Sequence, residues 1–245
     1  TAQLLRLVVD AGRHVPMYRR LWADSGVDWS DLRTTRDFQR LPRVDKAVLR
    51  ASRPEDRIHA RRRGSRLVEE RSSGSSGEPL TVFKDRYVDV VRRWAFLRAL
   101  HACGYRPGQQ CLLLTSRRDA RERRLARWCY ASIGEDTATL LARLEAQSPD
   151  LLYGPLSTLE LLAERLAGRG RARPAPRLVV STAEQLTRPR RSILEGGFGT
   201  RVADFYGLSE FGLVAYRPPG GSAFVPARSS LLLEFLPVPG EPALE

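Results

Sequence analysis

The chain has 245 residues, of which 42% are apolar and 28% charged, and its formal net charge is +13. A chain of this length and composition can bury a sizeable core, which excludes fibrous, collagen-like and wholly disordered proteins. No apolar run approaches the roughly 20 residues that a membrane span needs, and the first residues lack a basic and then apolar leader. We therefore expect one large domain or two small ones, without a signal peptide or membrane segment.

The positive charge comes almost entirely from arginine. Forty-one residues are basic, and only Lys46 and Lys84 are lysines, a skew that resembles a compositional bias more than selection for phosphate binding. The arginines are scattered, and no aromatic residues interleave with their clusters as a single-strand stacking platform requires. We expect non-specific nucleic-acid binding only, with a basic nucleic-acid-binding protein as one alternative.

Cysteine and histidine are sparse. Cys103, Cys111 and Cys129 have no paired metal-ligand spacing, and their odd number argues for a reducing compartment, hence a cytoplasmic location. The three histidines include no pair four residues apart, so we expect no structural zinc site.

The N-terminal segment is predicted to be helical. Apolar residues recur at helical spacing through residues 1–26, with Pro16 as an interruption. Residues 41–46 indicate a loop that leads into a short helix, and Asp45 can cap that helix.

A strand–loop–strand pattern follows. Short β-prone runs at 67–68 and 80–83 flank a loop rich in serine and glycine. Asp85 can cap the next helix, which Gly104 ends.

From residue 110 the chain alternates between β-prone runs and helical segments. Strands are expected at 111–114, 151–153, 178–180 and 202–206, and helices at 137–146, 158–167 and 187–194. This alternation predicts a mainly parallel sheet with right-handed crossovers through residues 110–206. Beyond Gly212, runs at 214–216 and 231–236 indicate a short β-meander.

The loop between the first two strands is the first candidate site, and it contains Ser72, Ser73, Gly74, Ser75, Ser76 and Gly77. Its glycines allow backbone N–H groups to converge on an anion, and its serine hydroxyls add donors. It is not a Walker A loop, because no lysine follows and a strand comes next. A flexible linker or a hairpin turn would explain the same composition.

A second candidate site follows the last strand of the predicted parallel sheet, in the run Asp204-Phe205-Tyr206-Gly207-Leu208-Ser209-Glu210. Open α/β sheets bind ligands at this carboxyl edge. An aromatic ring can stack on a base, a hydroxyl can reach a phosphate, and a carboxylate can hold Mg²⁺. A strand that ends in a glycine turn with a capping Ser/Glu pair is the structural alternative.

Together these segments resemble the adenylate-forming enzymes. Residues 72–79 are similar to their phosphate loop, 181–186 (Ser-Thr-Ala-Glu-Gln-Leu) to their S-G-A-E-P-L segment, and 204–210 to their adenine and magnesium motif. The run Tyr-Gly-Leu-Ser-Glu at 206–210 and the turn at 153–157 are most similar to the corresponding segments of the phenylacetate–coenzyme A ligase branch.

The resemblance implies a fold and a domain plan. The fold is the α/β large N-terminal domain of an adenylate-forming enzyme, with a mainly parallel sheet, flanking helices and a short β-meander. The small C-terminal domain is expected to be absent, which leaves an incomplete adenylation core over residues 1–245. Its parts are a helical segment at 1–50, a phosphate-loop hairpin at 66–84, the sheet at 110–206 and the meander at 212–236.

The resemblance also implies site residues. Ser72 to Gly77 would hold the β- and γ-phosphates of ATP, and Ala183, Glu184 and Gln185 would line the adenine pocket. Asp204 would face the exocyclic amine, and Tyr206, followed by Gly207, would stack on the base. The catalytic residues would be Ser209, which touches the α-phosphate, and Glu210, which binds Mg²⁺.

The implied reaction is the ATP-dependent conversion of a carboxylic acid into an acyl- or aryl-adenylate. Transfer to coenzyme A or to a carrier-protein thiol would follow, with no membrane and no specific nucleic acid as partner. The sequence departs from the pattern at Thr182, which replaces a glycine, and at the arginine-rich run 117–127, where relatives form the acyl pocket. A non-catalytic descendant that binds a nucleotide or a partner is therefore the main alternative, and the identity of the acid stays open.

Overall fold

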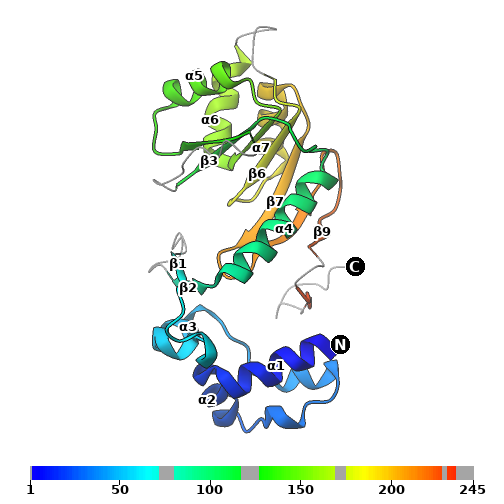
Figure 1. Cartoon of the computed structure of the whole chain (residues 1–245). Coiled ribbons are helices and arrows are strands. Elements are labelled where there is room, and N and C mark those ends of the chain that lie inside the picture. Colours follow the sequence, from blue (N-terminus) through cyan, green and yellow to red (C-terminus); the bar gives the residue numbers. More distant parts are fainter. Residues whose placement is uncertain (1, 72–79, 117–126, 169–174, 228–230, 236–245) are drawn as a thin grey trace. The chain divides into compact units, whose positions relative to one another are not determined.

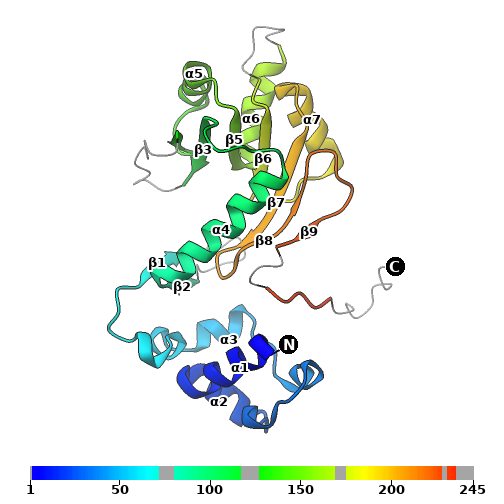
Figure 2. The ribbon, with the colours of Figure 1, turned by 45° about the vertical axis from the view of Figure 1, so that its right-hand side comes forward.

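The computed structural model describes residues 2–71, 80–116, 127–168, 175–227 and 231–235. The predicted phosphate loop, Ser72 to Gly77, lies outside these residues. The chain forms two compact units, Thr1–Asp89 and Val90–Glu245, which are described separately (Figures 1 and 2). None of the described helices is long and apolar enough to cross a membrane.

The N-terminal unit begins with short helices. Its α-helices are α1 (Ala2–His14), α2 (Pro16–Asp24) and α3 (Lys46–Ala51), and its 3-10 helices are η1 (Trp29–Asp31), η2 (Thr35–Arg40), η3 (Pro54–Arg57) and η4 (Ala60–Arg62). The predicted interruption is confirmed, because Pro16 starts a new helix and only Val15 separates it from the end of α1. The predicted cap is confirmed as well, since the Asp45 carboxylate accepts the N–H of Val48 at 2.9 Å.

An antiparallel hairpin of β1 (Val68–Arg71) and β2 (Thr81–Lys84) completes this unit. Lys84 is buried, and its ammonium pairs with the carboxylate of Glu70. Asp85 then caps α4 (Arg86–Ala102) by accepting the N–H of Val88 at 2.9 Å, as expected.

The second unit contains a seven-stranded sheet in the order β4-β3-β5-β6-β7-β8-β9. The strands are β3 (Cys111–Thr115), β4 (Trp128–Ser132), β5 (Leu151–Pro155), β6 (Leu178–Thr182), β7 (Val202–Leu208), β8 (Gly212–Arg217) and β9 (Val225–Pro226). The five strands from β4 to β7 are parallel, and β8 and β9 add antiparallel to the β7 edge. The predicted mainly parallel α/β sheet is confirmed.

Helices cover both faces of this sheet. The helices α5 (Thr137–Gln147), α6 (Leu156–Ala167) and α7 (Arg188–Phe198) bury leucines and Phe198 in a cluster with Val179 and Val202. The neighbouring residues Val180 and Ala203 point to the opposite face, where they join Leu100 of α4. This alternation is the side-chain period of a strand, so both faces of the central strands are buried.

Two details differ from the sequence-based expectation. The edge strand β4 was not expected, because its short apolar run Trp-Cys-Tyr-Ala directly follows the arginine-rich run 117–127 and no helical segment was predicted between it and the strand at 111–114. The strand expected at 231–236 is wrong over 231–235, which are not in a strand. Leu232 and Phe235 are 66% and 89% exposed, so this run has no apolar surface to pack against. Val225–Pro226 supplies the outer strand of the meander instead.

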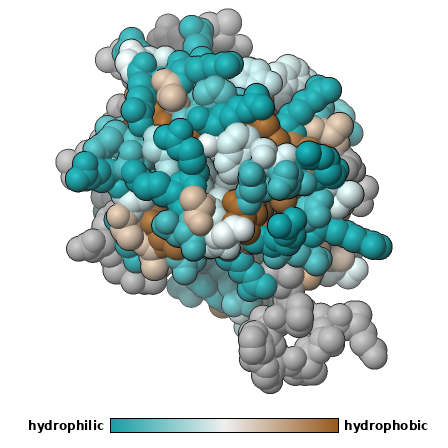
Figure 3. Space-filling view, turned by 90° about the horizontal axis from the view of Figure 1, so that it is seen from below, coloured by the Kyte–Doolittle hydropathy of each residue, from teal (hydrophilic) through white to brown (hydrophobic). Residues whose placement is uncertain are grey.

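The surface reflects the arginine-rich composition. In the space-filling view of Figure 3, hydrophilic side chains cover most of the visible face, and the hydrophobic areas between them are small and separate. Scattered apolar surface of this kind is ordinary for a globular protein.

Candidate nucleotide site

Two of the predicted site segments, and the turn that resembles the phenylacetate–coenzyme A ligase branch, lie at the ends of neighbouring parallel strands. Across the sheet, Pro155 at the end of β5 pairs with Thr182 at the end of β6, and Thr182 pairs with Phe205 of β7. The turn at 153–157, the loop at 183–185 and the motif at 204–210 therefore meet at one carboxyl edge, where open α/β sheets bind ligands.

The motif at 204–210 is longer as a strand than the sequence predicts. β7 continues to Leu208 and turns back into β8, so that Ser209, Glu210 and Phe211 form the tip of a hairpin. Tyr206 stands where the strand leaves the core, and it is 51% exposed. Its ring is thus accessible to a ligand at the carboxyl edge.

Two glycines shape this hairpin. A Cβ on Gly207 would lie 2.9 Å from the carbonyl oxygen of Gly212 on the opposite strand, and the register of β7 against β8 shifts between Tyr206 and Gly207. Gly212 has φ +76°, in the left-handed region that side chains disfavour. The hairpin can close in this form only with glycine at both positions.

An arginine from α4 holds the tip of the hairpin. The guanidinium of Arg92 donates to the backbone carbonyl of Glu210. A Cβ on Gly212 would lie 3.0 Å from the Arg92 side chain, so the two segments are in close contact. Figure 2 shows α4 running along β7 and β8. The position of Glu210 therefore depends on α4.

Asp204 is buried in the sheet and is paired. One of its oxygens accepts a hydrogen bond from Arg217, directly across on β8, at 2.7 Å. Burial raises the pKa of the Asp204 carboxyl, and the hydrogen bond from Arg217 opposes that rise. Arg217 also donates to the carbonyl of Leu186 at 3.3 Å, which ties the hairpin to the loop after β6.

The loop after β6 has an unusual backbone. Ala183 has φ +70°, a left-handed conformation that costs about 1–2 kcal/mol for a residue with a Cβ. Thr182 precedes it and donates its hydroxyl to the carbonyl of Phe205 at 3.1 Å. Strained backbone of this kind concentrates at ligand sites, and here it sets the direction in which Ala183, Glu184 and Gln185 leave the sheet.

Glu184 lies within a network of charges. Its carboxylate accepts the N–H of Ser157 at the start of α6 at 3.0 Å, and Arg190 pairs with it at 3.1 Å. Arg190 also binds both oxygens of Glu160, at 2.6 and 2.5 Å. Partial burial works to raise the pKa of Glu184, but the bonds from Ser157 and Arg190 hold it below its usual value. Glu184 thus links the loop after β6 to the loop after β5.

Aromatic side chains support the same edge from the α4 face. Phe96 meets Tyr153 and Phe205 edge to face, with ring centroids 5.2 and 5.8 Å apart. Phe205 also contacts Tyr216 on β8 at 6.0 Å. Burial raises the pKa of the Tyr153 hydroxyl. These contacts fix the ends of β5, β7 and β8 relative to one another.

Three arginines have roles at this edge that the sequence does not predict. They are Arg92, Arg190 and Arg217, which bind Glu210, Glu184 and Asp204 respectively. In a chain with scattered arginines, no sequence signal separates these three from the rest.

Comparisons with known proteins show similarity to coenzyme A ligases. No protein-family profile matches the chain. The chain is 28% identical over 222 residues to phenylacetate–coenzyme A ligase of Thermus thermophilus, and 29% identical over 233 residues to that of Escherichia coli. The alignments cover 85% and 86% of this chain and 49% and 50% of the two relatives, so the chain spans about half their length.

Solved structures show the same fold. A 2-hydroxyisobutyryl-CoA ligase, solved in complex with 2-HIB-AMP and CoA, superposes with a TM-score of 0.73 at 19% identity. The match covers 93% of this chain and 52% of that one. The chain is thus similar in sequence to phenylacetate–coenzyme A ligases and in fold to a 2-hydroxyisobutyryl-CoA ligase. Its sheet is that of the N-terminal domain of such enzymes.

Proposed function

We propose that the protein activates a carboxylic acid with ATP as an acyl- or aryl-adenylate and then transfers the acyl group to coenzyme A. The observation that carries this proposal is the meeting of three motif segments at the carboxyl edge of one parallel sheet. The curated relatives are ligases of this class by name, and the solved neighbour was determined with an acyl-AMP and CoA.

We assign the adenine site to the loop after β6 and to the end of β7. Tyr206 is half exposed, so that its ring can stack on the base, with Gly207 beside it. Ala183 and Gln185 are exposed, and we assign them to the adenine pocket, while Glu184 fixes the loop through Ser157 and Arg190.

The assignment of Asp204 takes account of its partner. Arg217 takes Oδ2 of this carboxylate, which leaves Oδ1 as the oxygen for the exocyclic amine of adenine. The buried pair would keep that acceptor in a fixed position in the sheet.

We assign the phosphates to the Ser72–Gly77 loop and to Ser209, and Mg²⁺ to Glu210. Mg²⁺ takes few protein carboxylates and keeps several waters, so a single glutamate on a hairpin tip fits its chemistry. Bound there, the ion would supply positive charge to the phosphates. Arg92 binds the backbone carbonyl of Glu210 and not its side chain, so the carboxylate stays available for the ion while the hairpin tip is held in place.

The proposed reaction has two steps. A carboxylate oxygen of the acid attacks the α-phosphorus, a new acyl–oxygen–phosphorus bond forms, and pyrophosphate leaves with the bonding electron pair. A thiolate then attacks the acyl carbon and AMP leaves. We assign the second step to the whole protein, and we place the protein in the cytoplasm, as its sparse cysteines suggest.

Carboxylate-dependent ATP–pyrophosphate exchange tests this proposal. The protein is incubated with MgATP, labelled pyrophosphate and one acid at a time from a panel of aryl, fatty and amino acids. We expect label in ATP with one class of acid only. MgATP binding without exchange for any acid would instead identify a non-catalytic nucleotide-binding descendant. Absence of both would reject the proposed function.

A further inference from the structure

The N-terminal unit brings together two histidines and an aspartate that are far apart in the sequence. Asp10 and His14 lie one turn apart on α1, and His59 precedes η4, 49 residues beyond Asp10. One carboxylate oxygen of Asp10 is 3.0 Å from Nδ1 of His14, and the other is 2.9 Å from Nε2 of His59. The two imidazoles stack with centroids 4.7 Å apart and an interplanar angle of 20°.

The three residues lie close enough to bind one metal ion once the two rings turn out of their stack and their nitrogens move closer together. One ligand atom from each residue lies within 4.8 Å of the other two. At metal–ligand distances of about 2.1 Å, neighbouring ligand atoms are about 3.0 Å apart at a right angle and about 3.4 Å apart in a tetrahedron. We propose that Asp10, His14 and His59 bind a divalent transition-metal ion such as Zn²⁺.

The donor set selects the class of metal. Two imidazoles and one carboxylate suit Zn²⁺, Ni²⁺, Co²⁺ or Cu²⁺, whereas Mg²⁺ and Ca²⁺ prefer oxygen ligands only. The side chains of His14, His59 and Asp10 are 20%, 26% and 48% exposed, so an ion can reach them. Three protein ligands leave a position for water or an anion.

Binding has a cost that limits the affinity. The backbone N–H of Arg61 donates to Nδ1 of His59 at 3.2 Å, so a neutral His59 ring carries its proton on Nε2, toward Asp10. A metal on Nε2 moves that proton to Nδ1 and breaks the bond from Arg61. A matching change occurs on His14, whose Nδ1 lies 3.1 Å from the carbonyl oxygen of Asp10.

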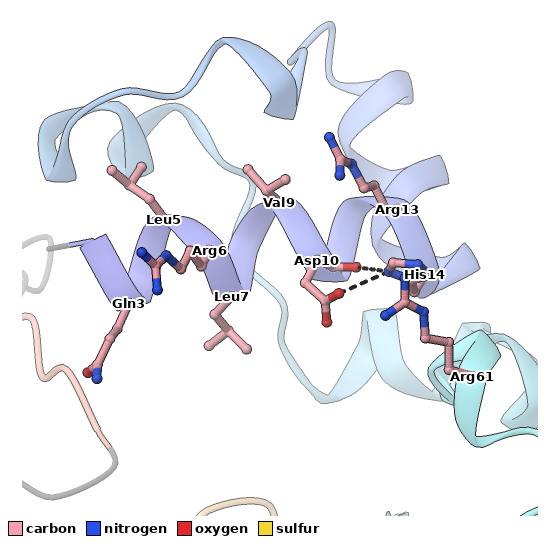
Figure 4. Close-up of a pocket in the computed structure, with 9 residues that line it drawn as sticks. All are labelled: Gln3, Leu5, Arg6, Leu7, Val9, Asp10, Arg13, His14 and Arg61. Carbon is pink, nitrogen blue, oxygen red and sulfur yellow. Dashed lines mark hydrogen bonds and ion pairs between the residues drawn. The ribbon is translucent and has the colours of Figure 1, made fainter.

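The surroundings also oppose a cation. Arg6, Arg13 and Arg61 line a shallow surface pocket of about 690 Å³ that includes Asp10 and His14 (Figure 4). Their positive potential weakens metal binding and favours an anion in the open position. We therefore expect a dissociation constant on the order of micromolar, weaker than that of a closed structural zinc site.

Calorimetric titration of the 245-residue protein with Zn²⁺ tests the site. We expect one equivalent to bind with micromolar affinity, and Asp10→Asn, His14→Gln and His59→Gln each to weaken binding by about tenfold or more. His101→Gln is the matched control, because His101 is the third histidine and is exposed on α4. Cys129→Ser excludes the one partly exposed cysteine as a ligand. Both control variants should bind as the wild type does.

A second measurement needs no variant. Paramagnetic Co²⁺ should broaden the imidazole NMR signals of two of the three histidines in the wild-type protein and leave the signal of His101 sharp. The inference is overturned if no stoichiometric binding is found up to millimolar Zn²⁺, if the His14 and His59 variants bind normally, or if Co²⁺ broadens all three signals alike. These outcomes do not depend on ATP or on any acid.

Discussion

Asp204 and Arg217 face each other across the β7–β8 hairpin, and their 2.7 Å ion pair is largely out of solvent. Asp204 is the candidate adenine ligand, so the residue assigned to binding also takes part in the packing of the sheet. Pairing by Arg217 offsets the cost of burying the carboxylate charge.

Removal of Arg217 should therefore destabilise the protein strongly. Arg217→Met leaves the Asp204 carboxylate buried without its partner, and we expect a loss of about 3–5 kcal/mol in the free energy of unfolding. The double variant Asp204→Asn with Arg217→Met should recover part of the loss. Urea denaturation of the two variants measures this, and equal stabilities would show that the Asp204 carboxylate carries no burial penalty when Arg217 is absent.

Glu210 should matter for chemistry and little for folding. Glu210→Gln keeps the shape of the side chain and removes its charge, and the Arg92 contact goes to the backbone. We expect pyrophosphate exchange to fall by one to several orders of magnitude, which is on the order of a few kcal/mol of transition-state stabilisation. The control is Glu164→Gln on the exposed side of α6. An unchanged rate in the Glu210 variant would reject the magnesium role.

Tyr206 should contribute to nucleotide affinity. If its ring stacks on the base, Tyr206→Ala weakens MgATP binding by about 1–3 kcal/mol, and Tyr206→Phe retains it. Tyr87→Ala, which removes a tyrosine that is 72% exposed on α4, serves as the control. Equilibrium dialysis with labelled ATP gives the affinities, and the stacking role fails if the alanine variant binds like the wild type.

Two adjacent glycines of α7 should respond oppositely to a methyl group. A Cβ on Gly197 would lie 2.4 Å from the backbone oxygen of Ala163 on α6, whereas a Cβ on Gly196 meets nothing within 4 Å. Gly197→Ala should cost about 1–3 kcal/mol through overpacking. Gly196→Ala should stabilise the helix by about 0.5–1 kcal/mol. Thermal unfolding of both variants provides the comparison, and a shift in the same direction would contradict this packing.

The cap of α5 should give the stability a defined pH dependence. The Asp136 carboxylate accepts the hydroxyl and the N–H of Thr139, at 2.6 and 2.9 Å, and these bonds lower its pKa below 3.8. The ionised Asp136 carboxylate therefore stabilises the folded protein at pH values above its usual pKa. This stabilisation is lost as the pH falls through the lowered pKa of the folded state.

Asp136→Ala should accordingly unfold at lower urea concentration than the wild type at pH 7. The difference between the two unfolding midpoints should become smaller toward pH 3. Asp136→Asn retains a capping side chain that does not titrate, so its difference from the alanine variant should stay nearly constant. A wild-type advantage over the alanine variant that is independent of pH would show that the charge of Asp136 does not stabilise the helix.

The sequence predicted the sheet because its central strands are buried on both faces. Leu112–Leu114 and Leu178–Val180 are continuous apolar runs, and the helices between them show a separate spacing. The same order of elements placed the candidate motifs at the carboxyl edge. The edge strand β4 was not predicted, because its short run Trp-Cys-Tyr-Ala directly follows the arginine-rich segment 117–127.

Contacts between residues from distant segments of the chain could not be predicted from the sequence. His14 and His59 have no motif spacing, and only the packing of η4 near α1 brings them to Asp10. Arg217 could be placed opposite Asp204 only once the hairpin register was known. The roles predicted for Ser209 and Glu210 stay predictions, as does the single adenylation core over residues 1–245.

The contact between Arg92 and the Glu210 carbonyl spans 118 residues of chain. Closing a loop of that length carries an entropic cost that is repaid only after the intervening strands are in place. The hairpin tip should accordingly be among the last parts of the second unit to reach its final position. During synthesis and refolding, intermediates that already have a sheet would lack an ordered tip at the proposed magnesium site, so that MgATP binding would be a late reporter of complete folding.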